Sequence, residues 1–238
     1  GGSMTSLLNL LSFIHKDELD IDVLFMDRYG ELLEPAQDVA NVLAEDKLLQ
    51  AVSTPRPKLK ELERYDLILL RAILAVIGKV SHKTTSDIAY THAAPKYDDK
   101  YDCVVAYQES IATSFVAEIK CKRKIAWVHN DYENVKKICR GSENLRRLYS
   151  AFDKVVCVSK AGRRNFQEKS GLPSEQIDYV YNALRSDSIR SKAKVPVELV
   201  LDDIKNKAHV LELLENRAIK FVSSGRFAEQ KRFDRNGL

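Results

Sequence analysis

Apolar positions in the second half of the chain form short runs that alternate with amphipathic stretches. The apolar runs, rich in β-branched residues, occupy residues 103–107, 124–129, 154–159 and 177–182. The stretches between them have helical spacing and occupy residues 109–120, 144–152 and 160–171. Near-continuous apolar strands that alternate with helices are typical of a parallel sheet covered on both faces. We therefore predict an α/β fold: a Rossmann-like parallel sheet with helices on both faces.

The first half has a less regular pattern. Residues 3–15 carry leucines on one helical face, with Ser3 as the expected N-cap, and residues 21–26 and 38–43 suit short strands. A longer helical pattern covers residues 58–80 and is apolar around most of its circumference. Its cations lie within about 100° of one another: Lys60, Arg64, Arg71 and Lys79. Such a helix is either buried in a core or lies on a membrane surface with its cations toward the headgroups.

The pattern after residue 184 suggests a domain boundary. Residues 185–217 are polar and partly helical, and residues 219–226 are one more buried-type strand that ends in Gly-Arg. A lone strand at this point resembles the opening of a second α/β domain. We predict a Rossmann-like domain over residues 1–184, a helical connection over 185–217, and the first strand and loop of a truncated domain over 218–238.

Composition and charge narrow the possible functions. Apolar residues make up 45% and charged residues 30% of the 238 positions, as in ordinary soluble globular proteins. The net charge of +4 divides into −7 over residues 1–118 and +11 over residues 119–238. A basic half suits phosphorylated ligands, an anionic membrane or nucleic acid, or is simply a set of solvated helix faces. Because the motifs of nucleic-acid binding proteins are absent from the sequence, we expect no nucleic-acid partner.

The cysteines and the first residues bear on the cellular compartment. The four cysteines contain no Cys-x-x-Cys pair, so we expect free buried thiols in a reducing cytoplasm and no metal site. The first six residues resemble neither region of a signal peptide. We expect a cytoplasmic protein, peripheral on the inner face of the membrane if residues 64–80 contact lipid.

Candidate chemistry lies where strands end, because ligands bind parallel sheets at that edge. His129, Asn130 and Asp131 follow one apolar run, and Ser159 follows the next. A histidine there can position or polarise a sugar hydroxyl or a phosphate, although a lone histidine is more often a satisfied hydrogen-bonding group. Ser159 also suits the N-cap of the following helix.

Two further places suit a phosphate. Gly1 and Gly2 precede the first helix, where bare N–H groups favour an anion, although such a turn is often only structural. Arg226 follows the last predicted strand, and Lys231 stands five residues later. Bidentate arginine and a lysine point charge together suit a diphosphate.

Several segments, in order, resemble the retaining glycosyltransferases of family 4, which have the GT-B architecture. GGSMTSLLNLL is similar to the glycine-rich first loop and helix of that family, and KIAWVHND to the strand that ends in its active-site histidine. FDKVVCVSKAGRRNFQEKSGLPSEQIDYVYNAL is similar to its long run ending in asparagine, here Asn182. IKFVSSGRFAEQKRFD resembles the entry to its donor domain. The resemblance spans nearly the whole chain.

The resemblance implies transfer of a sugar from a nucleotide-diphosphate-sugar to a polysaccharide or lipid-linked saccharide acceptor, without a metal or other cofactor. By carry-over, Gly2 approaches the donor phosphates, His129 stands near the transferred sugar, and Arg226 and Lys231 clamp the diphosphate. Asn130, Asp131, Ser159 and Asn182 are acceptor-side candidates.

The departures from the family imply a fragment. Its first strand is expected before Gly1 and its donor-side glutamate pair beyond residue 238, so the chain alone is expected to be inactive. Ala183 replaces the usual glycine after Asn182, and Arg232 replaces the one after Lys231. Two alternatives remain: a non-catalytic, membrane-docking and acceptor-binding subunit of a split transferase, and a flavodoxin-like domain that binds nucleotide or phosphate.

Overall fold

The chain divides into two compact units, residues 1–184 and 185–238. The computed structural model describes residues 2–15, 17–30, 32–195, 208, 211, 212 and 215. In the second unit, helix α11 covers Ser186–Lys192, in the stretch predicted to be partly helical. The predicted strand at 219–226 lies outside the described residues, and so do Gly1, Arg226 and Lys231.

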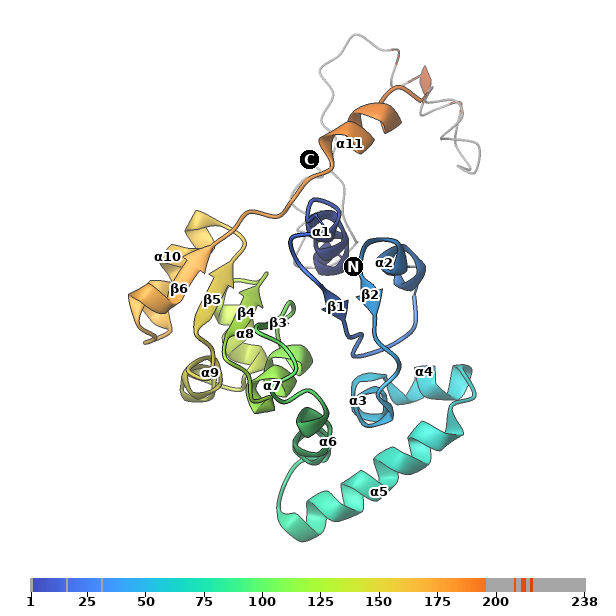
Figure 1. The fold of residues 1–238 in the computed structure, drawn as a ribbon, viewed down its shortest axis with the longest axis vertical. Helices are drawn as coiled ribbons and strands as arrows, with labels where there is room; N and C mark the ends of the chain where they lie inside the picture. The colour runs from blue at the N-terminus through green and yellow to red at the C-terminus, as the bar shows by residue number, and fades with distance from the viewer. Residues whose placement is uncertain are drawn as a thin grey trace. The chain divides into compact units, whose positions relative to one another are not determined.

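A four-stranded parallel sheet forms the centre of the first unit (Figure 1). Its strands run in the order β3 (Val104–Ala106), β4 (Lys124–Val128), β5 (Lys154–Cys157) and β6 (Ile177–Tyr179). The connecting helices are α7 (Ile111–Glu118), α8 (Tyr132–Ile138), α9 (Ser142–Tyr149) and α10 (Lys160–Lys169), with a 3₁₀ turn at Ser174–Gln176 before β6. This regular alternation confirms the predicted α/β, Rossmann-like fold.

The hydrophobic core lies against one face of this sheet. A row of paired residues crosses all four strands on that face, and each is almost fully buried: Ala106, Ala126, Val155 and Ile177. Phe115, Tyr149 and Phe166 from the connecting helices belong to the same cluster. Because the strand order advances in one direction and such crossovers are right-handed, the connecting helices lie on the same side.

A second, two-stranded parallel sheet is formed by the first part of the chain. It pairs β1 (Asp22–Val23) with β2 (Asn41–Val42), preceded by α1 (Gly2–Leu11) and connected through α2 (Leu33–Val39). The phenol of Tyr101, just before β3, donates a hydrogen bond of 2.7 Å to the carboxylate of Asp22 and so connects the two sheets.

Two predictions for this region were wrong. Residues 38 and 39 end a helix, and only Asn41–Val42 of the predicted strand 38–43 forms a strand. Pro35 lies in the first turn of that helix, where the missing N–H of proline costs nothing. Helix α1 begins at Gly2, so Ser3 lies inside its first turn rather than at the N-cap.

Four helices separate the two sheets in sequence: α3 (Lys47–Ser53), α4 (Arg56–Glu61), α5 (Tyr65–Ser81) and α6 (Thr85–Ala93), followed by a 3₁₀ turn at Ala94–Lys96. The single helix predicted over 58–80 is therefore two helices. Between them, Glu63 has φ +54°, in the left-handed region, which a continuous helix cannot contain.

Helix α5 is only half buried, and its cations do not all face solvent as one group. Leu67 and Leu74 are buried on the side that packs against α3, α4 and α6. Arg64 pairs with Glu45 and Asp66 at 2.6 and 3.0 Å, and Arg71 donates to the carbonyl of Thr54 at 3.1 Å. Two of the four predicted cations therefore bind protein groups.

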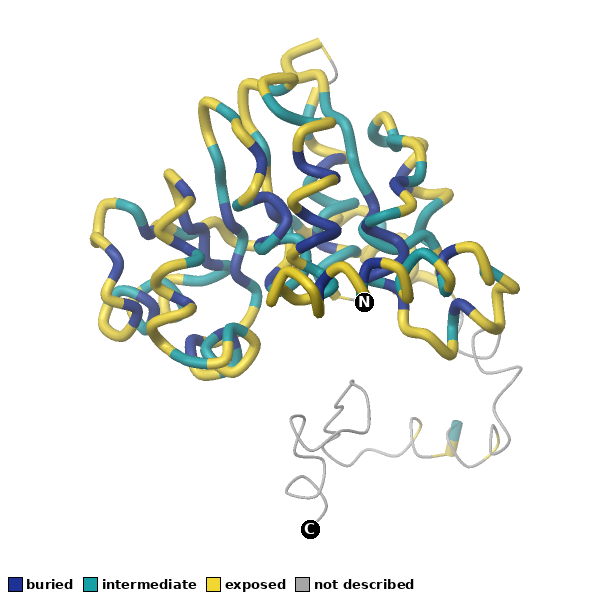
Figure 2. The backbone as a smooth tube through the Cα atoms, turned by 90° about the horizontal axis from the view of Figure 1, so that it is seen from below, coloured by how far each residue is buried: buried dark blue, intermediate teal, exposed yellow. Residues whose placement is uncertain are grey.

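Buried positions gather between the elements, and the outward faces of the helices are exposed (Figure 2). The four cysteines are free, but only Cys157 is buried and Cys103 is exposed, so the expectation of four buried thiols was wrong. Burial raises the pKa of the Cys157 thiol to about 12.

Among the described helices, none is both long and apolar enough to span a bilayer.

Candidate functional site

The carboxyl ends of the parallel strands bring several polar residues to one edge of the four-stranded sheet. Residues 107–110 follow β3, residues 129–131 follow β4, residues 158–159 follow β5 and residues 180–182 follow β6. Because Ala106 pairs with Ala126 and Val128 pairs with Cys157, these segments begin at similar heights on neighbouring strands. This is the edge at which sheets of this class bind ligands.

His129 is half-buried and has a defined orientation. Its Nε2 lies 2.9 Å from the carbonyl oxygen of Tyr107. A carbonyl oxygen only accepts, so Nε2 carries the proton in this contact. The neutral ring then presents the lone pair of Nδ1, which has no hydrogen bond within the described part of the chain. The imidazole also contacts the Tyr107 ring, with centroids 5.1 Å apart.

Glu109, which we did not predict, holds the turn that carries His129. Its side chain is buried, with 6% of the residue exposed. One carboxylate oxygen accepts hydrogen bonds from the backbone N–H of His129 and from the backbone and side-chain N–H groups of Asn130, the last two at 2.7 and 3.3 Å. Such bonds to a charged acceptor are stronger than neutral ones. Glu109 is therefore a positioning residue for the segment after β4.

The residue after Glu109 has a strained backbone. Ser110 has φ +83° and ψ −109°, although it carries a side chain. Such conformations cost about 1–3 kcal/mol and cluster at functional sites. The strain lies at the start of α7, directly beside the carboxylate that orders His129 and Asn130, and supports this edge as the functional one.

Helix α1 joins the same edge through a buried hydroxyl. Ser6 is 5% exposed and donates to Oδ1 of Asn182 at 2.7 Å. Since its single proton is used there, the phenol of Tyr107, 2.9 Å away, is the donor to Ser6 Oγ. Burial raises the pKa of Tyr107, which keeps this phenol protonated. Asn182 is thereby brought to the same network as the segment after β3.

Asp131 and Ser159 act as helix caps. The carboxylate of Asp131 accepts from the backbone and side-chain N–H groups of Asn134 at 2.9 and 2.7 Å, at the start of α8. The hydroxyl of Ser159 accepts from the backbone N–H of Gly162 at 2.9 Å, at the start of α10. These contacts give both residues a structural role at the candidate edge.

Two cations stand at this edge that we did not single out from the sequence. Lys160 Nζ and the guanidinium of Arg163 lie 5.7 and 5.9 Å from the centre of the Tyr179 ring. The Nε of Arg163 is buried and has no hydrogen-bond partner within the described residues. The signal available in the sequence was a Lys-x-x-Arg spacing directly after Ser159, which places both cations in the first turn of a helix.

Of the residues predicted to bind the donor phosphates, only Gly2 is among the described residues. Gly2 is exposed at the first position of α1, and a Cβ added there would meet nothing within 4 Å. Packing therefore does not require glycine at this position. Its expected phosphate-binding partners Gly1, Arg226 and Lys231 are not among the described residues.

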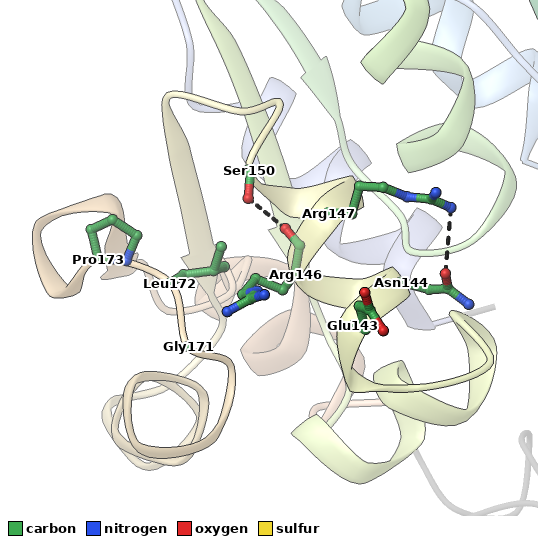
Figure 3. Close-up of a pocket in the computed structure, with 8 residues that line it drawn as sticks. All are labelled: Glu143, Asn144, Arg146, Arg147, Ser150, Gly171, Leu172 and Pro173. Carbon is green, nitrogen blue, oxygen red and sulfur yellow. Dashed lines mark hydrogen bonds between the residues drawn. The ribbon is translucent and has the colours of Figure 1, made fainter.

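One surface hollow lies away from these residues. It has a volume of about 340 Å³ and is lined by α9 and the loop before β6, including Arg146, Arg147 and Pro173 (Figure 3). The loops that line it precede strands rather than follow them, so it belongs to the amino edge of the sheet. None of the predicted site residues lines it.

Neither a metal-ligand cluster among the described residues nor a known relative identifies this site. Within the described ranges, no three His, Cys, Asp or Glu side chains are grouped as metal ligands would be. No protein-family model matches the chain, and no curated protein matches it significantly. Evidence for a function therefore comes from the chemistry of the carboxyl edge.

Proposed function

We propose that this chain is the acceptor-side part of a retaining glycosyltransferase, which moves a sugar from a nucleotide-diphosphate-sugar to a polysaccharide or glycolipid acceptor. The observation that carries the proposal is His129, held at the carboxyl edge of a Rossmann-like sheet. Its ring is anchored to the Tyr107 carbonyl, and its backbone is anchored to the buried carboxylate of Glu109. The resemblance of KIAWVHND to a family 4 transferase segment supports the same role.

In the proposed reaction, the bond between the sugar C1 and the diphosphate oxygen breaks, and C1 bonds to the oxygen of an acceptor hydroxyl, whose proton passes to the departing diphosphate. The nucleoside diphosphate leaves with the electron pair. Nδ1 of His129, free when Nε2 binds the Tyr107 carbonyl, accepts a hydrogen bond from a hydroxyl of the transferred sugar. Positioning of this kind accelerates reactions because the reacting groups are already oriented.

The negative charge that grows on the leaving diphosphate requires cations. In this proposal Arg226 and Lys231 provide them, Gly2 lets the donor phosphates approach the backbone of α1, and no metal is used. Lys160 and Arg163, at the carboxyl ends of β5 and β6, add positive potential at the same edge. In this proposal Asn130 and Asn182 bind the acceptor.

The sugar nucleotide and lipid-linked acceptors of such an enzyme are cytoplasmic or lie at the inner face of the membrane, which is where we place this protein. The competing proposal is a non-catalytic, acceptor-binding subunit that works with a separate donor-binding polypeptide. It is favoured by the exposed apolar side chains of α5, among them Leu69 and Val80. The two proposals differ in what the coding sequence beside this frame encodes.

The test is turnover of sugar nucleotides by the chain expressed with its flanking coding sequence. Release of nucleoside diphosphate is measured over a panel of UDP-, GDP-, ADP- and TDP-sugars with a mixed saccharide acceptor. With the donor and acceptor that give turnover, His129→Ala should lower kcat by about 10²-fold, the usual scale for one positioned group. His92→Ala, an exposed histidine on α6, is the matched control and should leave kcat unchanged.

Two outcomes would contradict the proposal. Absence of turnover over the whole panel in the longer protein would reject sugar transfer. An unchanged rate in His129→Ala would remove His129 from the site. Donor binding by a separately encoded partner, with none by the longer protein, would favour the split assembly.

A further inference from the structure

Helix α5 carries an apolar face that the described part of the chain does not cover. Tyr65, Leu69, Ile73, Val76 and Val80 follow one another at intervals of three or four residues, the spacing of a single helical face. Their exposed fractions run from 49% at Ile73 to 80% at Val80. The opposite side of the helix packs against α3, α4 and α6, so this face is turned outward (Figure 1).

An exposed apolar stripe of this length needs an explanation. Soluble proteins expose single apolar residues freely, but contiguous patches mark contact with another protein or a membrane. The burial of Leu67 and Leu74 already fixes α5 to the rest of the unit. The outward residues therefore add nothing to that packing, and their apolar character points to an external contact.

The charge around the stripe indicates which kind of contact. Residues 56–83 carry seven cations and three acids, whereas the other positions of 1–118 carry five cations and sixteen acids. The exposed apolar helix thus lies in a local cationic stretch of an otherwise acidic half. Lys60 stands before the start of the stripe, and Lys79 and Lys83 stand at its end.

These three lysines are available to an outside partner. All three are exposed, and within the described residues none forms an ion pair. By contrast, Arg64 and Lys58 are engaged with Glu45 and Glu61. An apolar stripe with free lysines at its C-terminal end matches a surface that is negatively charged outside and apolar below, because lysine can extend to headgroups while apolar side chains enter the acyl boundary.

We propose that the outward face of α5 docks on an anionic lipid bilayer, with the five stripe residues in the acyl boundary and Lys79 and Lys83 against acidic headgroups. The helix lies parallel to the membrane and does not cross it. This inference rests on α5 and on Lys83, which follows it, and holds whether or not the protein transfers sugars.

The test measures binding of the full chain to vesicles by co-sedimentation. Vesicles of phosphatidylcholine are compared with vesicles that contain about one-third phosphatidylglycerol. Binding should be at least about tenfold tighter to the anionic vesicles and should weaken with salt, since headgroup attraction is screened. No binding to the anionic vesicles would overturn the proposal.

Substitutions then locate the binding face. Leu69→Asn with Ile73→Asn should weaken binding by about tenfold or more, because two apolar side chains no longer enter the bilayer. Phe13→Asn with Leu19→Asn is the matched control, since these residues are equally exposed outside α5. If the two pairs behave alike, the docking face is not α5. Urea denaturation of each variant separates lost binding from lost folding.

A further pair of substitutions tests the role of the lysines. Lys79→Gln with Lys83→Gln should weaken binding to anionic vesicles by about 20- to 30-fold, from roughly fivefold per lysine at a membrane surface. Lys100→Gln with Lys120→Gln is the control pair.

Sedimentation velocity without lipid tests whether a second copy of the chain, and not lipid, covers this face. A dimer that the Leu69 and Ile73 substitutions dissociate would show that a second copy covers this face and would overturn the lipid proposal.

Discussion

The carboxyl edge of the four-stranded sheet and helix α5 depart from ordinary globular structure in opposite directions. At the edge, polar side chains such as Glu109 and Ser6 are buried. On α5, large apolar side chains such as Leu69 and Val80 are exposed. Both arrangements are unfavourable unless something compensates for them, because burying a polar group and hydrating an apolar one each cost free energy.

The difference lies in where that compensation comes from. Two buried polar groups of the edge are satisfied from within: Glu109 accepts from the segment after β4, and Ser6 contacts the ends of β3 and β6. The exposed face of α5 has no such partner inside the described unit. The hydrogen bonds of Glu109 and Ser6 are therefore formed within the unit, whereas the apolar face of α5 requires a partner outside it. Stability measurements should separate the two.

The largest effect is expected within α5 itself. Leu74→Ala removes a side chain that is 4% exposed and should lower the free energy of unfolding by about 3–4 kcal/mol, from lost burial and the cavity left behind. Leu69→Ala, one turn away on the outward face, should change it by less than about 0.5 kcal/mol. Urea denaturation measures both. Equal losses would mean that the outward face is covered within the chain.

The next effect tests the buried carboxylate. Glu109→Ala leaves the N–H donors of His129 and Asn130 without their acceptor and should cost about 2–3 kcal/mol of unfolding free energy. Glu109→Gln keeps one carbonyl oxygen for these donors and should cost less. Glu118→Ala, an exposed acid on α7, serves as the reference. A cost for Glu109→Ala as small as that of the reference would show that Glu109 does not order this segment.

A smaller effect is expected at α1. Ser6→Ala breaks the contacts with Asn182 and Tyr107 and should cost about 1 kcal/mol, the usual net value for such hydrogen bonds. Ser12→Ala, whose hydroxyl bonds only to the carbonyl of Asn9 at an exposed position, is the control. A Ser6 variant as stable as the control would mean that α1 and the sheet edge are not coupled.

The effect that is smallest at neutral pH, and appears only in alkali, concerns the link between the two sheets. Burial first, and then a nearby carboxylate, raises the pKa of Tyr97 and of Tyr101 to about 12. Since unfolded tyrosine titrates near about 10, the unfolded chain loses these protons first, and stability should fall as pH rises from about 10 to 12. Tyr101→Phe should reduce this fall in the urea midpoint, whereas exposed Tyr65→Phe should not. A fall of the same size in both variants would show that Tyr101 does not cause the loss of stability in alkali.

Much of the fold was predictable where the pattern was strong. The strands at 124–129 and 154–159 and the helix at 160–171 agree with β4, β5 and α10, apart from one or two residues at their ends. Continuous β-branched runs and an N-cap such as Ser159 are local signals. The short helices α3 and α6 were missed, although Asp46 and the Thr84–Asp87 capping box mark their starts.

The site was predictable only in part. His129, Asn130 and Asp131 were found because they directly follow a recognisable strand. Glu109 was not, because its burial depends on the register between β3 and β4, which places it beside His129. Arg64 and Arg71 share a helical face in sequence, but the tertiary partners Glu45 and Thr54 decide where their charges go. Local periodicity contains no information about such distant partners.

The contact between Ser6 and Asn182 has a consequence for how the molecule is made. It joins residues 176 positions apart, nearly the full length of the first unit. Contacts at such separation form late, since closing a long loop costs chain entropy before it returns any bonding energy. During synthesis, α1 is made before β6, and the Ser6 hydroxyl can bond to the Asn182 amide only after residue 182 has left the ribosome. A nascent chain that ends before β6 therefore contains His129 but lacks this contact.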